Sequence, residues 1–195
     1  MKLSSIDVIL LLLYSPGYTD LINEPVDGRT KITKMLFLFE KELSKKFKLD
    51  KLTGDEDIFQ FKAWNFGPMS ATIFKNLDFL KNIGFVESAY ATTYGITAEE
   101  INEYNYYYNE LIENESNITE YKSEKFCLTT KGIKFIEAKG KYRLLSDDQK
   151  KYLREFKSKL NNASLRDILR YVYITYPEFT EKSLIKNNIL GENNG

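Results

Sequence analysis

The sequence contains no histidine, and this absence removes several kinds of active site at once. Hydrolases that use an imidazole base, and the commonest zinc ligand sets, need histidine. Cysteine occurs once, at Cys127, so an internal disulfide or a cysteine cluster for zinc cannot form. We therefore expect no catalytic residues, no metal site and no cofactor, and we expect a reducing, cytoplasmic environment.

Neither sign of charge dominates, because 28 Lys and Arg residues balance 28 Asp and Glu residues. Dedicated nucleic-acid-binding proteins usually carry a basic excess, although only the local surface has to be basic. Long apolar runs are also missing. The stretch Val8–Leu13 is far shorter than a membrane span and is followed by Pro16, so it predicts a buried helix and no membrane partner.

Helix-start and helix-stop signals outline most of the chain. Ser4 and Asp7 form a capping-box pattern before the first helix, and Ser146 with Gln149 forms another near the C-terminus. Apolar residues at helical spacing predict a second helix over 30–47 and a third over 68–83. On the second helix the lysines form a separate stripe that we expect to face solvent: Lys31, Lys34, Lys41 and Lys45.

Short strands are predicted around the third helix, at 58–62, from Phe85 onward and at 126–129. The order of strand, turn, helix and returning strands is typical of a winged-helix-like domain. We therefore predict one mainly α (α+β) domain over 1–195 with a small antiparallel sheet. Its expected parts are a winged-helix-like core (1–87 plus 125–140), an inserted acidic, Tyr-rich helical segment (88–124) and a C-terminal helical extension (141–190).

Three pieces of sequence occur in an informative order: TKMLFL at 33–38, AWNFGP at 63–68, and an amphipathic helix that closes with Phe79-Leu80 and Gly84. Together they resemble the Panacea antitoxin domain, also called the SocA-like domain, and its YwgA-like relatives. The resemblance covers residues 30–86 well and 126–138 loosely. It implies a mostly helical domain with a small sheet that acts by binding and has no catalytic residues, as in antitoxins that neutralise different toxins or in proteolytic adaptors.

The insertion is strongly acidic. From Gly95 to Glu124 eight glutamates stand against one base, Lys122, which leaves a net charge of eight minus one, or seven negative. In a DNA-binding winged helix this region lies against phosphate, which these charges would repel over a Debye length of roughly 8 Å. Acidic side chains with interleaved tyrosines suit a basic protein surface instead. A solvated insertion whose tyrosines pack on their own helix is the alternative.

Two sets of candidate residues follow. The candidates for a protein partner are aromatic residues of the turn and side chains of the insertion: Trp64, Phe66, Tyr104, Tyr106, Tyr107, Tyr108 and Glu110. The candidates for nucleic acid lie on the second and third helices: Lys31, Lys34, Lys75 and Asn82. Core packing under the turn is the alternative for Trp64 and Phe66, and an ordinary solvated helix face is the alternative for the lysines.

The hypothesis that we favour from the sequence is a non-enzymatic regulatory protein that neutralises or masks a protein partner, as an antitoxin or inhibitor does. The alternative is a winged-helix transcriptional regulator that binds DNA through the third helix. Asp78 lies near Lys75 in that helix and Leu38 interrupts the lysine stripe, so both features oppose phosphate binding.

Overall fold

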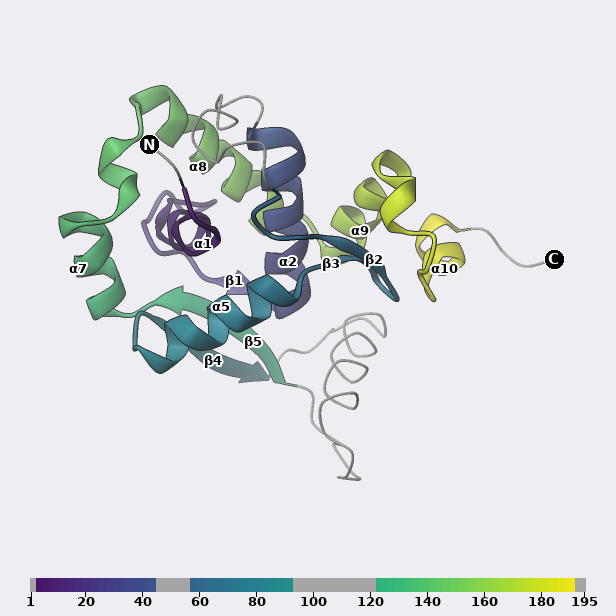
Figure 1. Cartoon of the computed structure of the whole chain (residues 1–195), viewed down its shortest axis with the longest axis horizontal. Helices are drawn as coiled ribbons and strands as arrows, with labels where there is room; N and C mark the ends of the chain where they lie inside the picture. Colours follow the sequence, from purple (N-terminus) through teal and green to yellow (C-terminus); the bar gives the residue numbers. More distant parts are fainter. Residues whose placement is uncertain (1–2, 45–56, 93–121, 192–195) are drawn as a thin grey trace.

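The computed structural model describes residues 3–44, 57–92 and 122–191, and the structural statements below concern these residues. Helix α1 (Ser5–Tyr14) lies at the centre, seen end-on in Figure 1 with other helices around it. The surrounding helices are α2 (Arg29–Leu38), α5 (Ala71–Asn82), α7 (Thr130–Ala138) and α8 (Asp147–Asn162). Helices α9 (Leu165–Thr175) and α10 (Lys186–Leu190) lie to one side (Figure 1).

Local signals explain where the central helix begins and why it is central. The predicted capping box is present, because Ser4 accepts a hydrogen bond from the Asp7 amide and the Asp7 carboxylate accepts one from Ser4. Every residue from Val8 to Tyr14 is buried, as expected for a helix that is apolar all round. The second predicted capping box, Ser146 with Gln149, begins α8 in the same way.

Three strands form an antiparallel sheet in the order β1-β5-β4. They are β1 (Val26–Asp27), β4 (Val86–Thr92) and β5 (Lys122–Leu128). The register places Val26 opposite Phe126, and it places Val86 opposite Leu128. The chain is therefore mainly helical with a small antiparallel sheet, which confirms the coarse prediction of fold class.

A separate hairpin holds the Trp-x-x-Gly-Pro turn and corrects two predicted elements. Strands β2 (Lys62–Trp64) and β3 (Gly67–Met69) pair around Asn65-Phe66. The strand predicted at 58–62 thus begins at Lys62. The third helix begins at Ala71 instead of Pro68, because Pro68 pairs within the hairpin and the Ser70 side chain caps the helix.

The second helix and the insertion also differ from their predicted bounds. Helix α2 continues as the π-helical turn η1 (Phe39–Leu43), so the predicted helix is not regular throughout, and its predicted end at 45–47 lies outside the described residues. Strands β4 and β5 extend into the predicted insertion 88–124, which leaves 93–121 between them. Helix α7 begins directly after β5, where the Thr129 hydroxyl accepts a hydrogen bond from the Gly132 amide.

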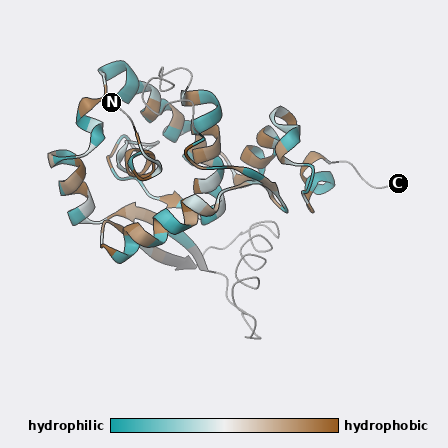
Figure 2. Cartoon of the chain, viewed as in Figure 1, coloured by the Kyte–Doolittle hydropathy of each residue, from teal (hydrophilic) through white to brown (hydrophobic). Residues whose placement is uncertain are grey.

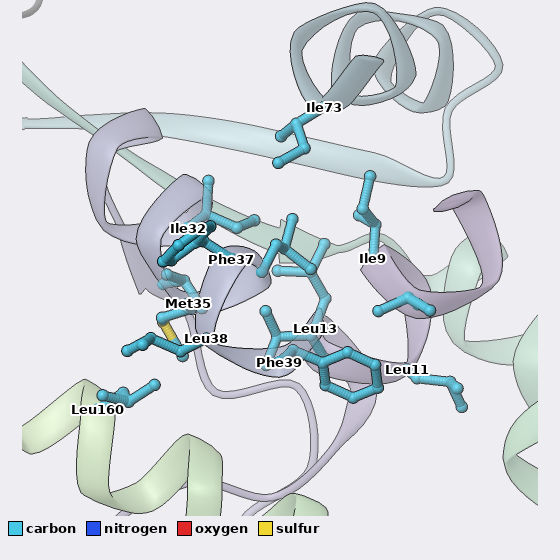
Figure 3. Close-up of a cluster of buried hydrophobic side chains, with 14 of the residues drawn as sticks. Ile9, Leu11, Leu13, Ile32, Met35, Phe37, Leu38, Phe39, Ile73 and Leu160 are labelled. Carbon is cyan, nitrogen blue, oxygen red and sulfur yellow. The ribbon is translucent and has the colours of Figure 1, made fainter. Parts of the chain in front are cut away.

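The core joins elements that lie far apart in the chain. Figure 3 draws Ile9 and Leu13 of α1 together with Met35 of α2, Ile73 of α5 and Leu160 of α8, and all five are buried. The surrounding helices alternate between teal and brown in Figure 2, as expected for helices with one buried and one exposed face. The hydrophobic effect is thus the main contribution that holds the small sheet and the helices together.

Cations cap the C-terminal ends of four helices. Lys157 Nζ donates to the carbonyl oxygens of Leu13 and Ser15 at 2.8 Å each, at the end of α1. Lys31 does the same for α8, Lys131 for α5 and Arg143 for α7. Free carbonyls and the helix dipole both favour a cation at this end. Part of the basic content of the chain therefore stabilises its own helices.

Candidate functional site

The Trp-x-x-Gly-Pro hairpin packs against the C-terminal part of the same chain. The Leu184 amide donates to the Asn65 carbonyl at 2.8 Å, and Phe66 is buried. Gly67 has φ +84°, and a Cβ added there would lie 2.9 Å from a ring carbon of Tyr173. Phe66 therefore contributes to internal packing, as in the alternative that the sequence analysis gives for it. Trp64 remains half-buried.

The prediction that the lysine stripe faces solvent is wrong for Lys31 and Lys34. Lys34 is fully buried, and its Nζ donates to the Pro68 carbonyl at 3.1 Å. Lys31 is 9% exposed, and its Nζ donates to the carbonyls of Asn161 and Ala163 at 2.9 Å each. Helix α2 is covered on both sides, so neither lysine can reach the phosphates of a nucleic acid.

The other two nucleic-acid candidates do lie on one exposed surface. Lys75 and Asn82 are exposed on α5, together with Asp78 and with Phe79, whose exposed fraction is 47%. Asp78 forms an ion pair with Arg29 at 3.2 Å. This face therefore carries one cation, one partly neutralised carboxylate and one apolar ring, which is a mixed surface rather than a basic one.

The insertion candidates Tyr104, Tyr106, Tyr107, Tyr108 and Glu110 lie outside the described residues. What the structure describes is the pair of strands that leads into and out of this segment. Strands β4 and β5 pair antiparallel over their whole length, and their last pair joins Thr92 to Lys122. Thr92 and Lys122, the residues that flank segment 93–121 in the sequence, therefore lie side by side at one end of the sheet (Figure 1).

Glu124 is a buried carboxylate, although the sequence analysis includes it in the net negative charge of the insertion. It is 4% exposed and accepts hydrogen bonds from Arg29 Nε at 2.7 Å and Lys81 Nζ at 2.8 Å. Burial by itself raises the pKa of Glu124, but the hydrogen bonds from Arg29 and Lys81 outweigh burial and hold the pKa below its usual value. The cluster joins β5 to α2 and α5.

Two further ionisable groups have strongly shifted pKa values. Burial, followed by a hydrogen bond to Asp57 and its negative charge, raises the pKa of Glu40 in η1 to about 8. Burial lowers the pKa of Lys157 to about 7. The spacing of residues in the sequence cannot reveal the shifted pKa of Glu40 or of Lys157, because the segments that bury these groups are distant in the chain.

Other chemistry in the described residues is sparse. Burial, followed by the charge and a hydrogen bond of Glu87, raises the pKa of Cys127 to about 11, which keeps its thiol protonated. Within 3–44, 57–92 and 122–191, no three His, Cys, Asp or Glu side chains gather as a metal-binding group. In the same ranges no helix has the length and apolar character that crossing a membrane requires.

Comparisons with known proteins add no relative. No protein-family model matches the chain, and neither a curated protein nor a solved structure is significantly similar to it.

Proposed function

We propose that this chain is a non-enzymatic regulatory protein that binds and masks a protein partner, in the manner of an antitoxin or inhibitor. The observation that carries the proposal is the β4–β5 hairpin. Its last pair, Thr92 with Lys122, holds both ends of a segment that contains seven glutamates and no lysine or arginine between residues 93 and 121. Seven negative charges thus lie, in the sequence, between two residues that pair at one end of the sheet.

The chemistry of this segment favours a basic protein surface as the partner. Seven carboxylates attract lysine and arginine side chains, and complementary charge increases the rate and the selectivity of association. Six tyrosines in the same segment, the predicted candidates Tyr104, Tyr106, Tyr107 and Tyr108 among them, offer large contact area at low entropic cost. The partner-binding role of Glu110 belongs to this proposal.

The arrangement of the elements supports a winged-helix-like core for this protein. The order α1, β1, α2, α5, β4, β5, with the sheet order β1-β5-β4, is the order expected of such a domain. In this interpretation α5 takes the position of the recognition helix and the β4–β5 hairpin takes the position of the wing. The resemblance to the Panacea domain is consistent with a binding role for it.

DNA binding through α5 is the second candidate function, because Lys75 and Asn82 are both exposed there. Three observations weigh against it. Lys31 and Lys34 are buried, Asp78 accompanies Lys75 on α5, and the negative segment connects the two strands of the hairpin that would lie on phosphate. A protein partner is therefore the better-supported proposal.

Co-expression of the full chain with the products of its neighbouring genes tests the proposal. We expect one product to co-purify, and we expect calorimetry to show binding that weakens between 50 and 300 mM salt. Glu103, Glu110 and Glu113, all changed to Gln, should weaken it at least fivefold. Changing Glu155, Glu178 and Glu181 to Gln, which removes three exposed charges elsewhere, should not.

A gel shift with salt titration tests the DNA alternative on the same protein. Two results together would favour DNA over a protein partner. The parent protein would retard DNA and release it as the salt concentration rises, and the variant with Lys75→Glu and Asn82→Ala would no longer retard it. The absence of any co-purifying product, or equal effects of the two Glu→Gln sets, would count against the function proposed here.

A further inference from the structure

The positive charge of this chain is concentrated in α7 and in the turn η2 (Lys141–Leu144) that follows it. The whole chain has a net charge of zero, and segment 93–121 contributes seven negative charges, so the other residues together carry seven positive charges. Residues 131–143 hold five bases and one acid, which is five minus one, or four positive charges. More than half of the positive excess therefore lies in this short stretch. We name its bases the α7 basic face: Lys131, Lys134, Lys139, Lys141 and Arg143.

Three members of the α7 basic face lie in a row along one side of the helix. Lys134 follows Lys131 by three residues, and Ala138 follows Lys134 by four, so each is a neighbour of the next on the helix surface, with Cβ atoms roughly 5–6 Å apart. Arg143 Nη1 donates to the Ala138 carbonyl at 2.7 Å, which places the guanidinium at the end of this row. The row thus runs from Lys131 through Lys134 to Arg143.

Both ends of the row are held in place without losing their charge. Lys131 Nζ donates to the Ile83 carbonyl at 2.7 Å and lies over the Phe85 ring, 5.4 Å from its centre. Lys131 and Arg143 are both exposed. Neither a carbonyl nor a ring neutralises a full positive charge, and an ammonium has three donors and a guanidinium five. Each end can therefore bind an anion with its remaining donors and loses little conformational freedom in doing so.

The other members of the α7 basic face are not neutralised by acids. Within the ranges that the structure describes, no carboxylate forms an ion pair with Lys134, Lys139 or Lys141. Lys134 and Lys139 are exposed, and Lys141 is half-buried. The one acid of the stretch, Glu137, accepts a hydrogen bond from the Tyr14 hydroxyl at 3.1 Å, so it points toward the end of α1.

Charges on the adjoining elements do not cancel this excess. The start of α8 adds two acids and two bases, which sum to zero: Asp147, Asp148, Lys150 and Lys151. Strand β4 follows Phe85, whose ring packs against Phe135 of α7 with the ring centres 4.7 Å apart. Its acid Glu87 lowers the sum from four to three positive charges. The surface around α7 therefore remains basic.

The position of α7 separates it from the residues that flank the acidic segment. Helix α7 begins directly after the Leu128 end of β5, whereas Lys122, which flanks segment 93–121, lies at the other end of that strand. A strand of this length spans about 20 Å. That span is more than twice the Debye length of roughly 8 Å at physiological salt. An anion bound at α7 would thus be screened from negative charge at the Lys122 end of the sheet.

From these observations we infer that the α7 basic face binds the phosphate backbone of a nucleic acid, through charge and without selecting a base sequence. A nucleic acid presents closely spaced negative charges along a line, which matches a row of cations along a helix. Protein interfaces depend instead on apolar and aromatic anchors. Residues 129–143 expose no large apolar side chain, and Leu144 at their edge is a single exposed residue of a kind common on surfaces.

This inference goes beyond the proposed function and concerns a different surface. Binding of a protein partner depends on the glutamates of segment 93–121, and the DNA candidate described above depends on Lys75 and Asn82 of α5. Helix α7 lies on the opposite side of the molecule from α9 and α10 (Figure 1). Variants of the α7 basic face can therefore fail or succeed independently of the variants that test the proposed function.

Fluorescence anisotropy with the full chain and a labelled DNA duplex of mixed sequence tests the inference. We expect binding at about 50 mM salt that weakens as salt rises, with a slope of log K against log salt between about −2.7 and −4.5, as three to five phosphate contacts give. A second duplex of unrelated sequence should bind with a dissociation constant within about twofold of the first, because backbone contacts carry no sequence information.

Paired charge reversals locate the binding surface. Lys134→Glu with Lys139→Glu should weaken binding at least tenfold at about 50 mM salt and should make the slope less steep by about 1.8, since two phosphate contacts are lost. The matched control is Lys62→Glu with Lys182→Glu, which makes the same charge change at exposed positions of the β2–β3 hairpin and the C-terminal part. It should change the dissociation constant by less than about threefold, because these charges lie outside the contact.

Two further variants and a stability check complete the design. Lys75→Glu with Asn82→Ala, which alters α5, should also retain binding to DNA. Lys134→Gln with Lys139→Gln removes the charge without reversing it and should weaken binding at least fivefold. Melting temperatures should match the parent protein in all variants, because the substituted side chains are exposed.

Four results would overturn the inference. The first is no binding of either duplex at about 50 mM salt. The second is an equal loss of binding in the two paired Lys→Glu variants, which would show that only the overall charge matters. The third is competition by polyglutamate that is as strong as competition by unlabelled duplex, which would indicate an acidic protein as the partner. The fourth is sedimentation with vesicles of equal phosphatidylglycerol and phosphatidylcholine that requires Lys134 and Lys139 and exceeds binding to DNA.

Discussion

The ammonium group of Lys34, which has no solvent exposure, donates a hydrogen bond to the carbonyl oxygen of Pro68 at 3.1 Å. This bond joins α2 to the Trp-x-x-Gly-Pro hairpin. On its other side the hairpin contacts Tyr173 and Leu184 of the C-terminal part. The Trp-x-x-Gly-Pro motif therefore lies at a junction of three parts of the chain.

Replacing Lys34 by glutamate should severely destabilise the protein. The carboxylate would be buried and would face the Pro68 carbonyl, so we expect a loss of more than about 3 kcal/mol in the free energy of unfolding. Lys75→Glu makes the same charge change at an exposed position of α5 and should change stability by no more than about 0.5 kcal/mol. Urea unfolding followed by the fluorescence of Trp64, the only tryptophan, measures both. Similar midpoints for the two variants would show that Lys34 is not buried as described.

Replacing Gly67 by valine should also destabilise the fold. Gly67 has φ +84°, and any side chain there meets the Tyr173 ring. We expect a loss of roughly 1–3 kcal/mol from the backbone alone, and more from the collision. Gly84→Val is the matched control, since Gly84 has φ +71° with no atom within 4 Å of an added Cβ. The difference between the two melting temperatures measures the cost of the contact with Tyr173. Equal melting temperatures would show that this contact does not affect stability.

Replacing Glu124 by glutamine should weaken the contact between β5 and the two helices. Arg29 and Lys81 would both lose their buried counter-charge, so we expect a loss of roughly 3 kcal/mol. Asp27→Asn removes an exposed partner of Lys125 and should cost less than about 1 kcal/mol. Denaturant titrations at neutral pH compare the two, and a smaller loss for Glu124→Gln than for Asp27→Asn would contradict the described burial.

The Glu124 cluster also predicts that the stability of the fold decreases at acidic pH. The pKa of Glu124 is lower in the folded protein than in the unfolded chain, where it is about 4.3. The stabilisation from Glu124 is therefore complete above that unfolded value and is lost as the pH falls through the folded pKa. Melting temperatures measured from pH 6 downward should fall less steeply in Glu124→Gln than in the parent protein.

The raised pKa of Glu40 predicts that the free energy of unfolding falls as the pH rises from about 4.3 to about 8. Its folded pKa of about 8 lies above the unfolded value of about 4.3, so the folded protein holds a proton that the unfolded chain releases. This contribution is present below the unfolded pKa and is lost as the pH rises to and through 8. Glu40→Gln keeps a neutral side chain, so its stability relative to the parent should rise from pH 5 to pH 9.

The comparison with Glu40→Gln is needed because Lys157 acts in the opposite direction. Its folded pKa of about 7 is below the unfolded value, so its contribution grows as the pH rises from 7. Subtracting the variant curve from the parent curve cancels the effect of Lys157. A difference that does not change with pH would show that Glu40 is ionised at neutral pH.

Local patterns predicted the elements whose determinants are local. The capping boxes at Ser4 and Ser146 and the buried run Val8–Leu13 were all confirmed. The strands predicted from Phe85 onward and at 126–129 were found as well, as β4 and as the end of β5, which begins earlier than predicted. Each of these depends on neighbours within a few residues, or on an alternation that the sequence displays directly.

The exposure of the lysines could not be predicted in the same way. Helical periodicity shows that two faces of α2 differ, but it does not show what covers the second face. Lys31 reaches carbonyls 130 and 132 residues away, and Lys34 reaches one 34 residues away. A long aliphatic stem allows a lysine to be buried when its ammonium group finds such acceptors. Glu124 was misjudged for the same reason, since its partners Arg29 and Lys81 belong to other elements.

The sequence by itself determined the mainly helical class, the central apolar helix and the concentration of negative charge between residues 93 and 121. These properties follow from composition and short-range spacing. Only the tertiary structure decided which charges are buried and which apolar side chains are exposed, as at Lys34, Glu124 and Leu21. The physical reason is that burial, hydrogen-bond partners and pKa depend on contacts between segments that are distant in sequence, and no local pattern encodes those contacts.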